Sequence, residues 1–298
     1  MKKIIFFCAA LLTATVSFAQ DRAAHLRDLL YNSQDYCLVV SHRGDWRSAP
    51  ENSLQAFKNC IEMGVDMVEL DLKMTKDSVL ILIHDPLLDR TTTAKGKPAD
   101  YTFEELRKNH KLKSEHNVAT RHDIPNLEEA LNLCKGKILI NIDKGYDYFQ
   151  QVYELLVKTG TLDQVVIKSN HVLEKVRKDN PGVLDKVIYM PIVNLDRPGA
   201  EQMIDEYATI KPVAIECCFK TYTPEVERLL NKVKDYGIKI WLNSLWASLS
   251  AGHDDDMAVE EKRPEESWGW LIKQGALLLQ TDRPANLIEY LKYHQLHE

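Results

Sequence analysis

A cluster of polar side chains, SHRGDWRSAPENS at residues 41–53, directly follows the apolar run CLVV. His42 and Arg43 begin this cluster, and a second histidine, His84, follows the apolar run VLILI. One imidazole can accept a proton from a nucleophile while another donates a proton to a leaving alcohol. A guanidinium offers a planar fork of donors that suits a phosphate. These residue types are therefore suited to the cleavage of a phosphoester.

Three acidic side chains lie in two other apolar runs. Glu69 and Asp71 stand two residues apart in MVELDLKMT, so on a β-strand both project from one face. Two like charges on a buried face are costly unless a cation or a shared proton compensates them. Asp143 in KILINIDK adds a third carboxylate, with Asn141 on the same face. Because oxygen ligands suit hard cations, we expect one divalent cation, Mg²⁺ or Ca²⁺, at Glu69, Asp71 and Asp143. The alternative is ion pairing of these acids with lysines elsewhere.

The elements that must position these residues alternate along the chain. Short β-branched runs are separated by amphipathic helical patterns, which is typical of an α/β protein with a parallel sheet. Eight such strands predict a closed (β/α)₈ TIM barrel, in which reactive groups gather at the carboxyl ends of the strands. The expected strands are residues 37–43, 67–75, 137–144, 164–170, 186–193, 213–220, 239–246 and 276–284.

One further apolar run, residues 79–85, breaks this alternation. It follows the second strand after the short turn KDS, and a parallel crossover needs a dozen or more residues. The sequence therefore predicts a β-hairpin extension in which Thr75 pairs near Val79. This register returns His84 to the level of Leu70, beside the first two acids.

The amino-terminal residues 1–19 have the pattern of a secretory signal peptide, with two lysines, an apolar core and the small-residue ending SFA. This predicts a secreted protein, with the periplasm as the expected compartment, and no stable membrane anchor. Residues 20–298 are expected to form one catalytic domain. The net charge of −6 disfavours nucleic acid as a partner. The five cysteines after Cys8 lack metal-ligand spacing and are expected to be buried free thiols.

The motifs HRG, PENS, VELDLKMTKDSVLILIHDPLLDRTT and QTDRPANLIEYL resemble those of the glycerophosphodiester phosphodiesterase family. In that family the motifs run in the order HRG, PENT, ExD, T-x-D-G, HD and T-D-x-P, and this chain has a counterpart of each in the same order. The resemblance extends from about Val39 to Tyr290. It implies a barrel that binds Mg²⁺ or Ca²⁺. It also implies hydrolysis of small glycerophosphodiesters to an alcohol and glycerol phosphate.

By position, the resemblance implies that His42 and His84 are the catalytic histidines and that Arg43 binds the phosphate. Glu69 and Asp71 match the first two metal ligands. Two residues of the PENS motif, Glu51 and Asn52, would support the site at its rim, with Glu51 close to substrate. For Asn52, capping of the first barrel helix is an equally good interpretation.

One departure from the family concerns the third metal ligand. The family pattern N-I-E-x-K is replaced by NIDKG, so Asp143 is one methylene shorter and Gly145 occupies the lysine position. Strand alternation is expected to turn Lys144 to the other face. We hypothesise that Lys168, at the end of the neighbouring strand, restores the missing charge near the substrate. The alternative is a solvated lysine at a strand end.

A second departure is the long loop at residues 247–267 after the seventh strand. Trp241 on that strand is expected to stack on the glycerol or the headgroup. His253 and Asp254 in the loop are expected either to contact substrate hydroxyls or a second cation, or to belong to a solvated acidic lid. Tyr146 and Tyr148 after the third strand either line the headgroup pocket or pack on neighbouring loops.

The sequence thus predicts a secreted, metal-dependent phosphodiesterase with His42 as base and His84 as acid, or the reverse. Three alternatives remain open at this point. The headgroup could differ, for example inositol; the barrel could be a metal-dependent sugar isomerase; or the protein could bind phosphodiesters without cleaving them. An arginine beside a histidine argues against a neutral sugar, and retention of both histidines argues against binding alone.

Overall fold

The centre of the protein is a closed barrel of parallel strands. The computed structural model describes residues 22–298, so the predicted signal peptide lies outside the described residues. The strands are β1 (Leu38–Ser41), β2 (Met67–Met74), β3 (Leu80–Leu82), β4 (Leu139–Asp143), β5 (Val165–Ser169), β6 (Ile188–Asn194), β7 (Ala214–Cys218), β8 (Lys239–Asn243) and β9 (Ala276–Thr281). They form a nine-stranded sheet in the order β1-β9-β8-β7-β6-β5-β4-β2-β3, which an additional pairing of β1 with β2 closes. The predicted TIM barrel is confirmed.

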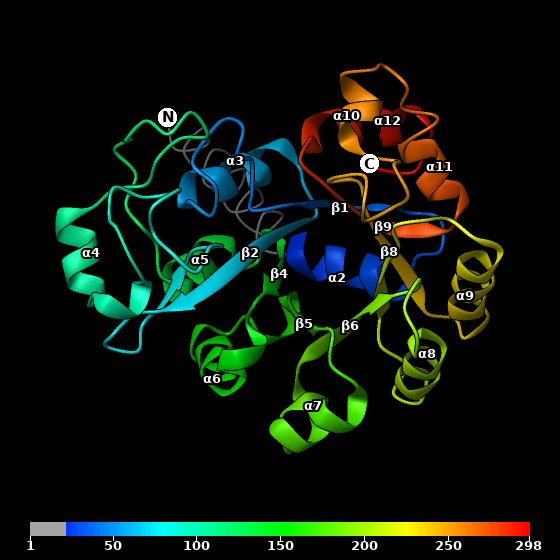
Figure 1. The fold of residues 1–298 in the computed structure, drawn as a ribbon, viewed down its shortest axis with the longest axis horizontal. Helices are drawn as coiled ribbons and strands as arrows, with labels where there is room; N and C mark the ends of the chain where they lie inside the picture. The colour runs from blue at the N-terminus through cyan, green and yellow to red at the C-terminus, as the bar shows by residue number, and fades with distance from the viewer. Residues whose placement is uncertain (1–21) are drawn as a thin grey trace, which may run out of the picture.

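Helices surround this barrel, as Figure 1 shows. They are α2 (Arg22–Asn32), α3 (Leu54–Met63), α4 (Phe103–Asn109), α5 (Leu127–Cys134), α6 (Phe149–Thr159), α7 (Leu173–Asp179), α8 (Ala200–Ala208), α9 (Pro224–Asp235), α10 (Asp255–Val259), α11 (Trp268–Lys273) and α12 (Pro284–Tyr293). Each barrel strand lies within its predicted run or extends one residue beyond it. The runs are easy to find because helices cover a parallel sheet and leave its strands buried.

The first barrel helix, α3, begins differently from one expectation. Ser53, not Asn52, is its N-cap, and the Ser53 side chain accepts a hydrogen bond from the backbone N–H of Ala56. The capping interpretation of Asn52 is therefore wrong. Asn52 is buried and bonds to β2 instead. Ser53 can cap the helix because its short hydroxyl reaches the free N–H groups of the first turn.

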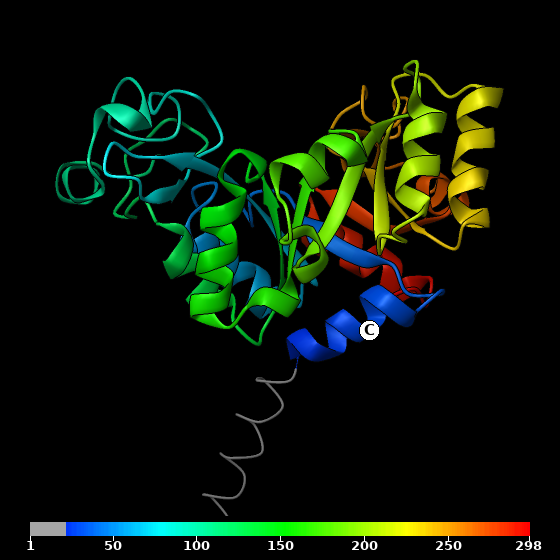
Figure 2. The same ribbon diagram turned by 90° about the horizontal axis from the view of Figure 1, so that it is seen from below.

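The barrel interior is apolar near the amino ends of the strands. Side chains from all eight barrel strands meet Leu26 and Leu30 of α2 and form one buried cluster. In Figure 2, α2 runs across this end of the barrel. The strand residues of the cluster are Leu38, Val40, Met67, Leu139, Val166, Ile188, Met190, Ala214, Trp241 and Leu278. This half of the interior is a packed core.

The interior becomes polar two residues further along most strands. Because side chains alternate across a strand, each of these residues points to the same side as the apolar residue before it. These polar residues are buried, and their alternation with the apolar interior residues places them inside the barrel. They are His42, Glu69, Asn141, Lys168, Glu216, Asn243 and Gln280.

Residues 75–126 form a lobe beside the barrel, which contains β3 and α4 and projects from one side in Figures 1 and 2. β3 pairs antiparallel with β2, with Leu82 opposite Leu72. The Thr75 N–H donates to the Val79 carbonyl, so the chain reverses in the expected register. A separate apolar cluster that includes Ile81, Leu106 and Ile124 holds the lobe together. This lobe carries the second histidine back toward the barrel.

The cysteines agree with the expectation of free thiols. Cys37, Cys60, Cys134, Cys217 and Cys218 are all buried and unpaired. Among the described residues, no helix is long and apolar enough to cross a bilayer.

Candidate active site

Three carboxylates meet at the carboxyl ends of β2 and β4. The parallel register places Glu69 opposite Asn141 and Asp71 opposite Asp143. Oxygen atoms of Glu69, Asp71 and Asp143 all lie within 4.8 Å of one another. Alternation along each strand and register between the strands therefore bring together the three acids that the sequence analysis selected.

The charges of this cluster are only partly balanced within the protein. Burial raises the pKa of Glu69 well above its usual value, and repulsion from Asp71 and Asp143 raises it further. Burial also acts to raise the pKa of Asp71, but His84, Lys144 and Arg43 outweigh it and lower this pKa. A hard cation at the three acids would relieve the repulsion at Glu69.

Several buried polar atoms beside the acids lack a well-directed hydrogen bond within the described residues. They are Asp71 Oδ1, Arg43 Nε and both polar atoms of the Asn141 amide. Buried polar groups are normally satisfied, so a cluster of such atoms marks a place where a ligand would complete the contacts. Carboxylate oxygens with an amide beside them form a hard-cation donor set. The residues present therefore fit a bound Mg²⁺ or Ca²⁺.

The loop from residue 42 to residue 53 is fastened to this cluster. Arg43 and Asn52 both adopt left-handed backbone conformations, with φ of 55° and 58°. The Arg43 N–H donates to Glu69 at 2.8 Å, and the Asn52 amide both donates to Asp71 Oδ2 and accepts from the Asp71 N–H. Such conformations are uncommon outside glycine and occur often at functional sites. The strain is offset here by bonds to the acids.

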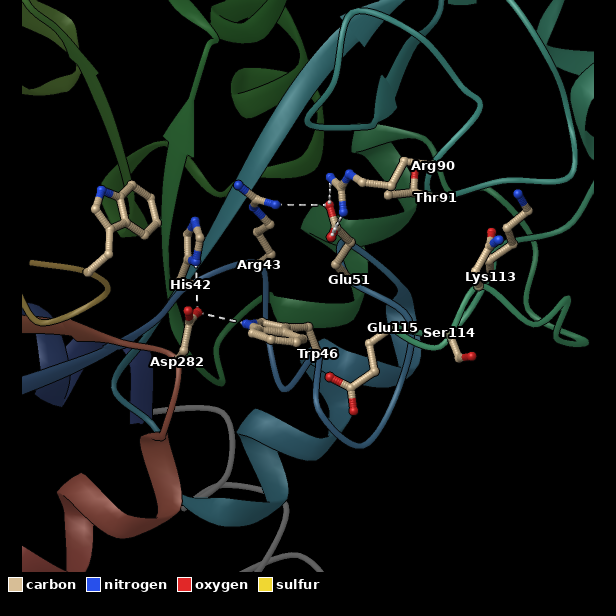
Figure 3. A pocket seen from close by; sticks show the side chains of 12 residues that line it. His42, Arg43, Trp46, Glu51, Arg90, Thr91, Lys113, Ser114, Glu115 and Asp282 are labelled. Atoms are coloured by element: carbon tan, nitrogen blue, oxygen red, sulfur yellow. Dashed lines mark hydrogen bonds and ion pairs between the residues drawn. The ribbon is translucent and has the colours of Figure 1, made fainter. Parts of the chain in front are cut away.

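His42, at the end of β1, is oriented by a carboxylate. Its Nδ1 lies 2.8 Å from Asp282 Oδ1, to which the Trp46 indole also donates at 2.7 Å (Figure 3). Asp282 directly follows β9, the neighbour of β1 in the barrel. Because Nδ1 is held, Nε2 is the nitrogen left to exchange a proton with a substrate.

His84 is held in the same way by its neighbour in sequence. Its Nδ1 lies 2.7 Å from Asp85 Oδ1, and Arg90 donates to both oxygens of Asp85. Arg90 also donates to both oxygens of Glu51, which accepts from Arg43 at 3.2 Å. Burial lowers the pKa of His84 despite its acidic neighbours. Glu51 therefore joins the arginine beside one histidine to the arginine that supports the other.

The side chain of Lys144 does not point in the predicted direction. Alternation was expected to turn it away, but its left-handed backbone, with φ of 55°, ends the strand pattern at this residue. The ammonium lies 3.2 Å from Asp71 Oδ1 and donates to the His84 carbonyl at 3.1 Å. At Gly145, a Cβ atom would lie only 2.6 Å from a Ile142 methyl carbon. Lys144, one residue earlier than the family lysine, therefore supplies a cation at the acids.

A pocket of about 420 Å³ opens beside His42. Figure 3 shows it extending from the His42–Asp282 pair, past Arg43 and Glu51, to the segment that contains Lys113 and Glu115. Its lining residues are His42, Arg43, Trp46, Glu51, Arg90, Thr91, Lys113, Ser114, Glu115, Asn117, Trp246 and Asp282. The lobe at residues 75–126 thus forms one wall, and the two tryptophans contribute aromatic surface.

Comparison with known proteins agrees with this geometry. A glycerophosphodiester phosphodiesterase of Caldanaerobacter subterraneus subsp. tengcongensis is 35% identical over 198 residues, which are 61% of this chain and 81% of that protein. The chain belongs to the glycerophosphodiester phosphodiesterase family. A relative with the same name from Bacillus altitudinis is 35% identical over 141 residues, but the match covers only 45% of this chain and 58% of that protein.

The solved structures give the same fold for the family. A glycerophosphoryl diester phosphodiesterase from Parabacteroides distasonis superposes with a TM-score of 0.74 at 27% identity, covering 91% of this chain and 92% of that one. A family model described as a domain of unknown function also matches residues 189–291. Membership of this enzyme family removes the sugar isomerase alternative.

Two predicted substrate contacts of this family member lie deeper than expected. Trp241 is fully buried in the apolar half of the barrel, where its indole donates to Asn243, so the prediction that it stacks on substrate is wrong. It points inward because it shares the inward alternation of β8. Lys168 is also buried, with its ammonium 2.7 Å from Glu216 Oε2, which contradicts the solvated alternative. Burial opposes its charge, but Glu216, Asp143 and Glu69 outweigh this effect and raise the pKa of Lys168.

The polar residues of the long loop are engaged in structure. Asp254 caps α10, and its side chain accepts from the Met257 N–H. His253 stacks on Trp270 at 3.7 Å and bonds to the Glu266 carbonyl. These contacts replace the predicted ones to substrate or a second cation. Tyr146 and Tyr148 line a different hollow, whose lining includes neither His42 nor His84.

Sequence reasoning missed several residues around the family site. Asp282 and Asp85 lie in the recognised T-D-x-P and HD motifs, so a signal for them was present, but no role was assigned. Trp46 is in the same stretch as His42, and Arg90 is in the same motif stretch as His84, whereas Trp246 carried no local signal. Their places depend on how the loops fold over the barrel end.

Proposed function

We propose that this chain is a secreted, metal-dependent phosphodiesterase that hydrolyses small glycerophosphodiesters to glycerol phosphate and an alcohol. The observation that carries the proposal is the pair of histidines, each bound through Nδ1 to a carboxylate, beside a cluster of three acids. A site that only bound a phosphodiester would not need two imidazoles with oriented nitrogens. The two oriented histidines therefore disfavour the alternative of a binding protein without activity.

Glu69, Asp71 and Asp143 would hold one divalent cation, Mg²⁺ or Ca²⁺. When bound, such a cation offsets negative charge on a phosphate and polarises its oxygens. Arg43 is placed beside these acids and would bind a phosphate oxygen through its guanidinium. Lys144 and the buried Lys168 add positive charge around the acids. We propose that together they replace the charge of the family lysine, whose position Gly145 occupies.

The histidines would divide the proton transfers. His42 takes a proton from the attacking water as the oxygen of that water bonds to phosphorus. The bond from phosphorus to the leaving alcohol breaks, and His84 donates a proton to the departing oxygen. The reverse assignment of base and acid fits the same geometry. A glycerol hydroxyl could attack in place of water, in which case a cyclic phosphate would form first and could be detected among the products.

We place the headgroup in the pocket that the lobe and the two tryptophans line. Trp46 and Trp246 offer faces to the carbon atoms of a headgroup, and Trp246 is 46% exposed. Ser114, Glu115 and Asn117 offer hydrogen bonds at the lobe side. These polar groups support a second candidate, a polyhydroxylated headgroup such as inositol, with the same chemistry.

One assay tests the proposed activity. Glycerophosphodiesters with choline, ethanolamine, glycerol and inositol headgroups would be incubated with the protein and Mg²⁺, Ca²⁺ or a chelator. We expect release of glycerol phosphate with a divalent cation and none with the chelator. Failure to hydrolyse any of them with either cation, while the protein binds them, would favour the binding protein.

Export of the chain is a separate part of the proposal. It is supported by the charged and apolar pattern of residues 1–19. Expression of the full chain with an epitope tag at the carboxyl end, followed by cell fractionation, tests it. We expect a shortened product outside the cytoplasm, and a full-length cytoplasmic product would contradict export.

A further inference from the structure

Asp255 is an almost fully buried acid in the segment between β8 and α11. Asp255 is 2% exposed, and its side chain accepts four hydrogen bonds from three separate parts of the chain. Three donors point to Oδ1 and one points to Oδ2. They are Ser244 Oγ at 2.6 Å, Thr281 Oγ1 at 2.8 Å, Trp268 Nε1 at 2.9 Å and, on Oδ2, Asp282 N at 2.6 Å.

The neighbouring acids of the same run have ordinary places. Asp254 caps α10, and the side chain of Asp256 is 76% exposed. Asp255 alone turns inward, where burial raises its pKa to about 6 although its hydrogen bonds favour the charged form. A buried carboxylate costs free energy of desolvation unless well-directed hydrogen-bond donors compensate it. The four donors therefore fix the Asp255 side chain in one position in the fold.

Asp255 contacts the end of β9, next to the hydrogen-bonded pair of His42 and Asp282. Asp255 binds the Thr281 hydroxyl and the Asp282 N–H, and Asp282 holds Nδ1 of His42. The His42 N–H also donates to the Thr281 carbonyl at 3.2 Å. A continuous path of hydrogen bonds thus leads from Asp255 through the end of β9 to the imidazole.

We propose that Asp255 is a positioning residue for the reaction, which holds Asp282 so that Asp282 orients His42. This inference depends on the proposed function. It also gives the loop at residues 247–267 a role different from a solvated acidic lid. Asp255 anchors the loop to the barrel. Trp246, directly before the loop, lies against His42, with the centres of the two rings 5.9 Å apart.

The test is the substitution Asp255→Asn, which keeps the volume but replaces one acceptor oxygen with an N–H donor among four donors. We expect kcat to fall about 10²-fold with KM changed by less than about threefold, because a small displacement of a catalytic group is this costly. The matched control, Asp256→Asn, makes the same chemical change one residue away on the surface. It should keep the kcat of the wild type.

A double variant distinguishes positioning from a general structural role. If Asp255 acts through Asp282, Asp255→Asn in an Asp282→Asn background should lower kcat no further, since groups that act as one unit are non-additive. Proton NMR gives an independent readout: the Nδ1–H signal of His42 should shift or broaden in Asp255→Asn and remain in Asp256→Asn.

Circular dichroism would confirm that the variants are folded. Should Asp255→Asn fail to fold, Ser244→Ala removes only one donor and should give a smaller loss of kcat in the same direction. A wild-type kcat in folded Asp255→Asn, or in Ser244→Ala if that variant replaces it, would overturn the inference, as would full additivity in the double variant. An inactive wild-type protein would instead overturn the proposed function, while the NMR comparison would still test the positioning.

Discussion

The two halves of the barrel interior are made by the same strands but have opposite chemistry. Near the amino ends, Val40, Met67 and Leu139 pack with α2 in an apolar core. Two residues later on the same strands come His42, Glu69 and Asn141, which are buried and polar. Burial of apolar surface in the first half stabilises the folded protein, whereas desolvation of polar groups in the second half offsets part of this stabilisation. One strand can therefore stabilise the fold at its amino end and place reactive groups at its carboxyl end.

The largest expected effect is on activity in the polar half. Glu69→Gln removes one of the three carboxylates, and we expect kcat/KM to fall more than about 10³-fold, or about 4 kcal/mol in the barrier. Without a divalent cation, the same variant should be more stable than the wild type by about 1 kcal/mol, because the repulsion that raises the pKa of Glu69 is gone.

Thermal unfolding with and without Mg²⁺ or Ca²⁺ checks this opposition. The cation should raise the Tm of the wild type more than that of Glu69→Gln, since it binds the folded state through the acids. A variant that lost activity but kept the full rise in Tm would show that the cation binds elsewhere.

Next in size is the buried ion pair of the polar half. Lys168→Met leaves Glu216 buried without its cation, and we expect a loss of about 3–5 kcal/mol in the free energy of unfolding. The double variant Lys168→Met/Glu216→Gln should recover most of this stability, as urea denaturation would measure. Phosphodiester turnover in the double variant then tests the proposed role of the Lys168 charge, and a wild-type rate would eliminate that role.

In the apolar half, the prediction is the reverse: stability should change without activity. Leu30→Ala on α2 removes a fully buried side chain and should cost about 2–5 kcal/mol in urea denaturation. At temperatures where the variant remains folded, kcat should equal that of the wild type. The adjacent Tyr31→Ala is the control, because Tyr31 is 49% exposed and its truncation should cost much less.

The smallest effect concerns a polar contact at the apolar end. His297 bonds to the buried Asp66, which also accepts from Tyr36 and from the Val39 N–H. Burial opposes the charge on His297, but Asp66 outweighs it and raises the pKa of His297. A raised pKa in the folded state stabilises the protein below the unfolded-state pKa, and this stabilisation is lost as pH rises through the folded-state pKa.

His297→Gln should therefore cost about 1 kcal/mol in acidic buffer and less at alkaline pH. Urea denaturation of both proteins across pH 5–9 would measure the difference. A difference that does not vary with pH would mean that the contact depends on packing and not on charge.

The sequence predicted most of the fold because its local patterns agree with its global topology. Each barrel strand is short, largely apolar and buried on both faces, so its start could be predicted within two residues and its end within three. Spacing alone placed Glu69 and Asp71 on one face, and motif resemblance selected His42, His84 and Arg43. For Asn52 the sequence left two interpretations open, a helix cap or support of the site. Ser53 caps the helix, and Asn52 binds Asp71.

Two predictions were wrong because residue order does not show where a side chain lies in the folded barrel. Lys144 was assigned by strand alternation, but a left-handed residue ends the strand there and returns its ammonium to Asp71. Trp241 was assigned by motif, but depth along the strand decides whether an inward residue meets substrate or core. Neither chain reversal at a single residue nor depth in a barrel is visible in residue order.

Residue order by itself determined the strands, the polar ends of those strands and the chemistry that their side chains can perform. Only the tertiary structure decided which partners those side chains have, as when Asp255, between β8 and α11, meets Asp282, which directly follows β9. Periodicity is a local property of neighbouring residues, whereas hydrogen-bond partners are fixed by closure of the barrel and by packing of its loops.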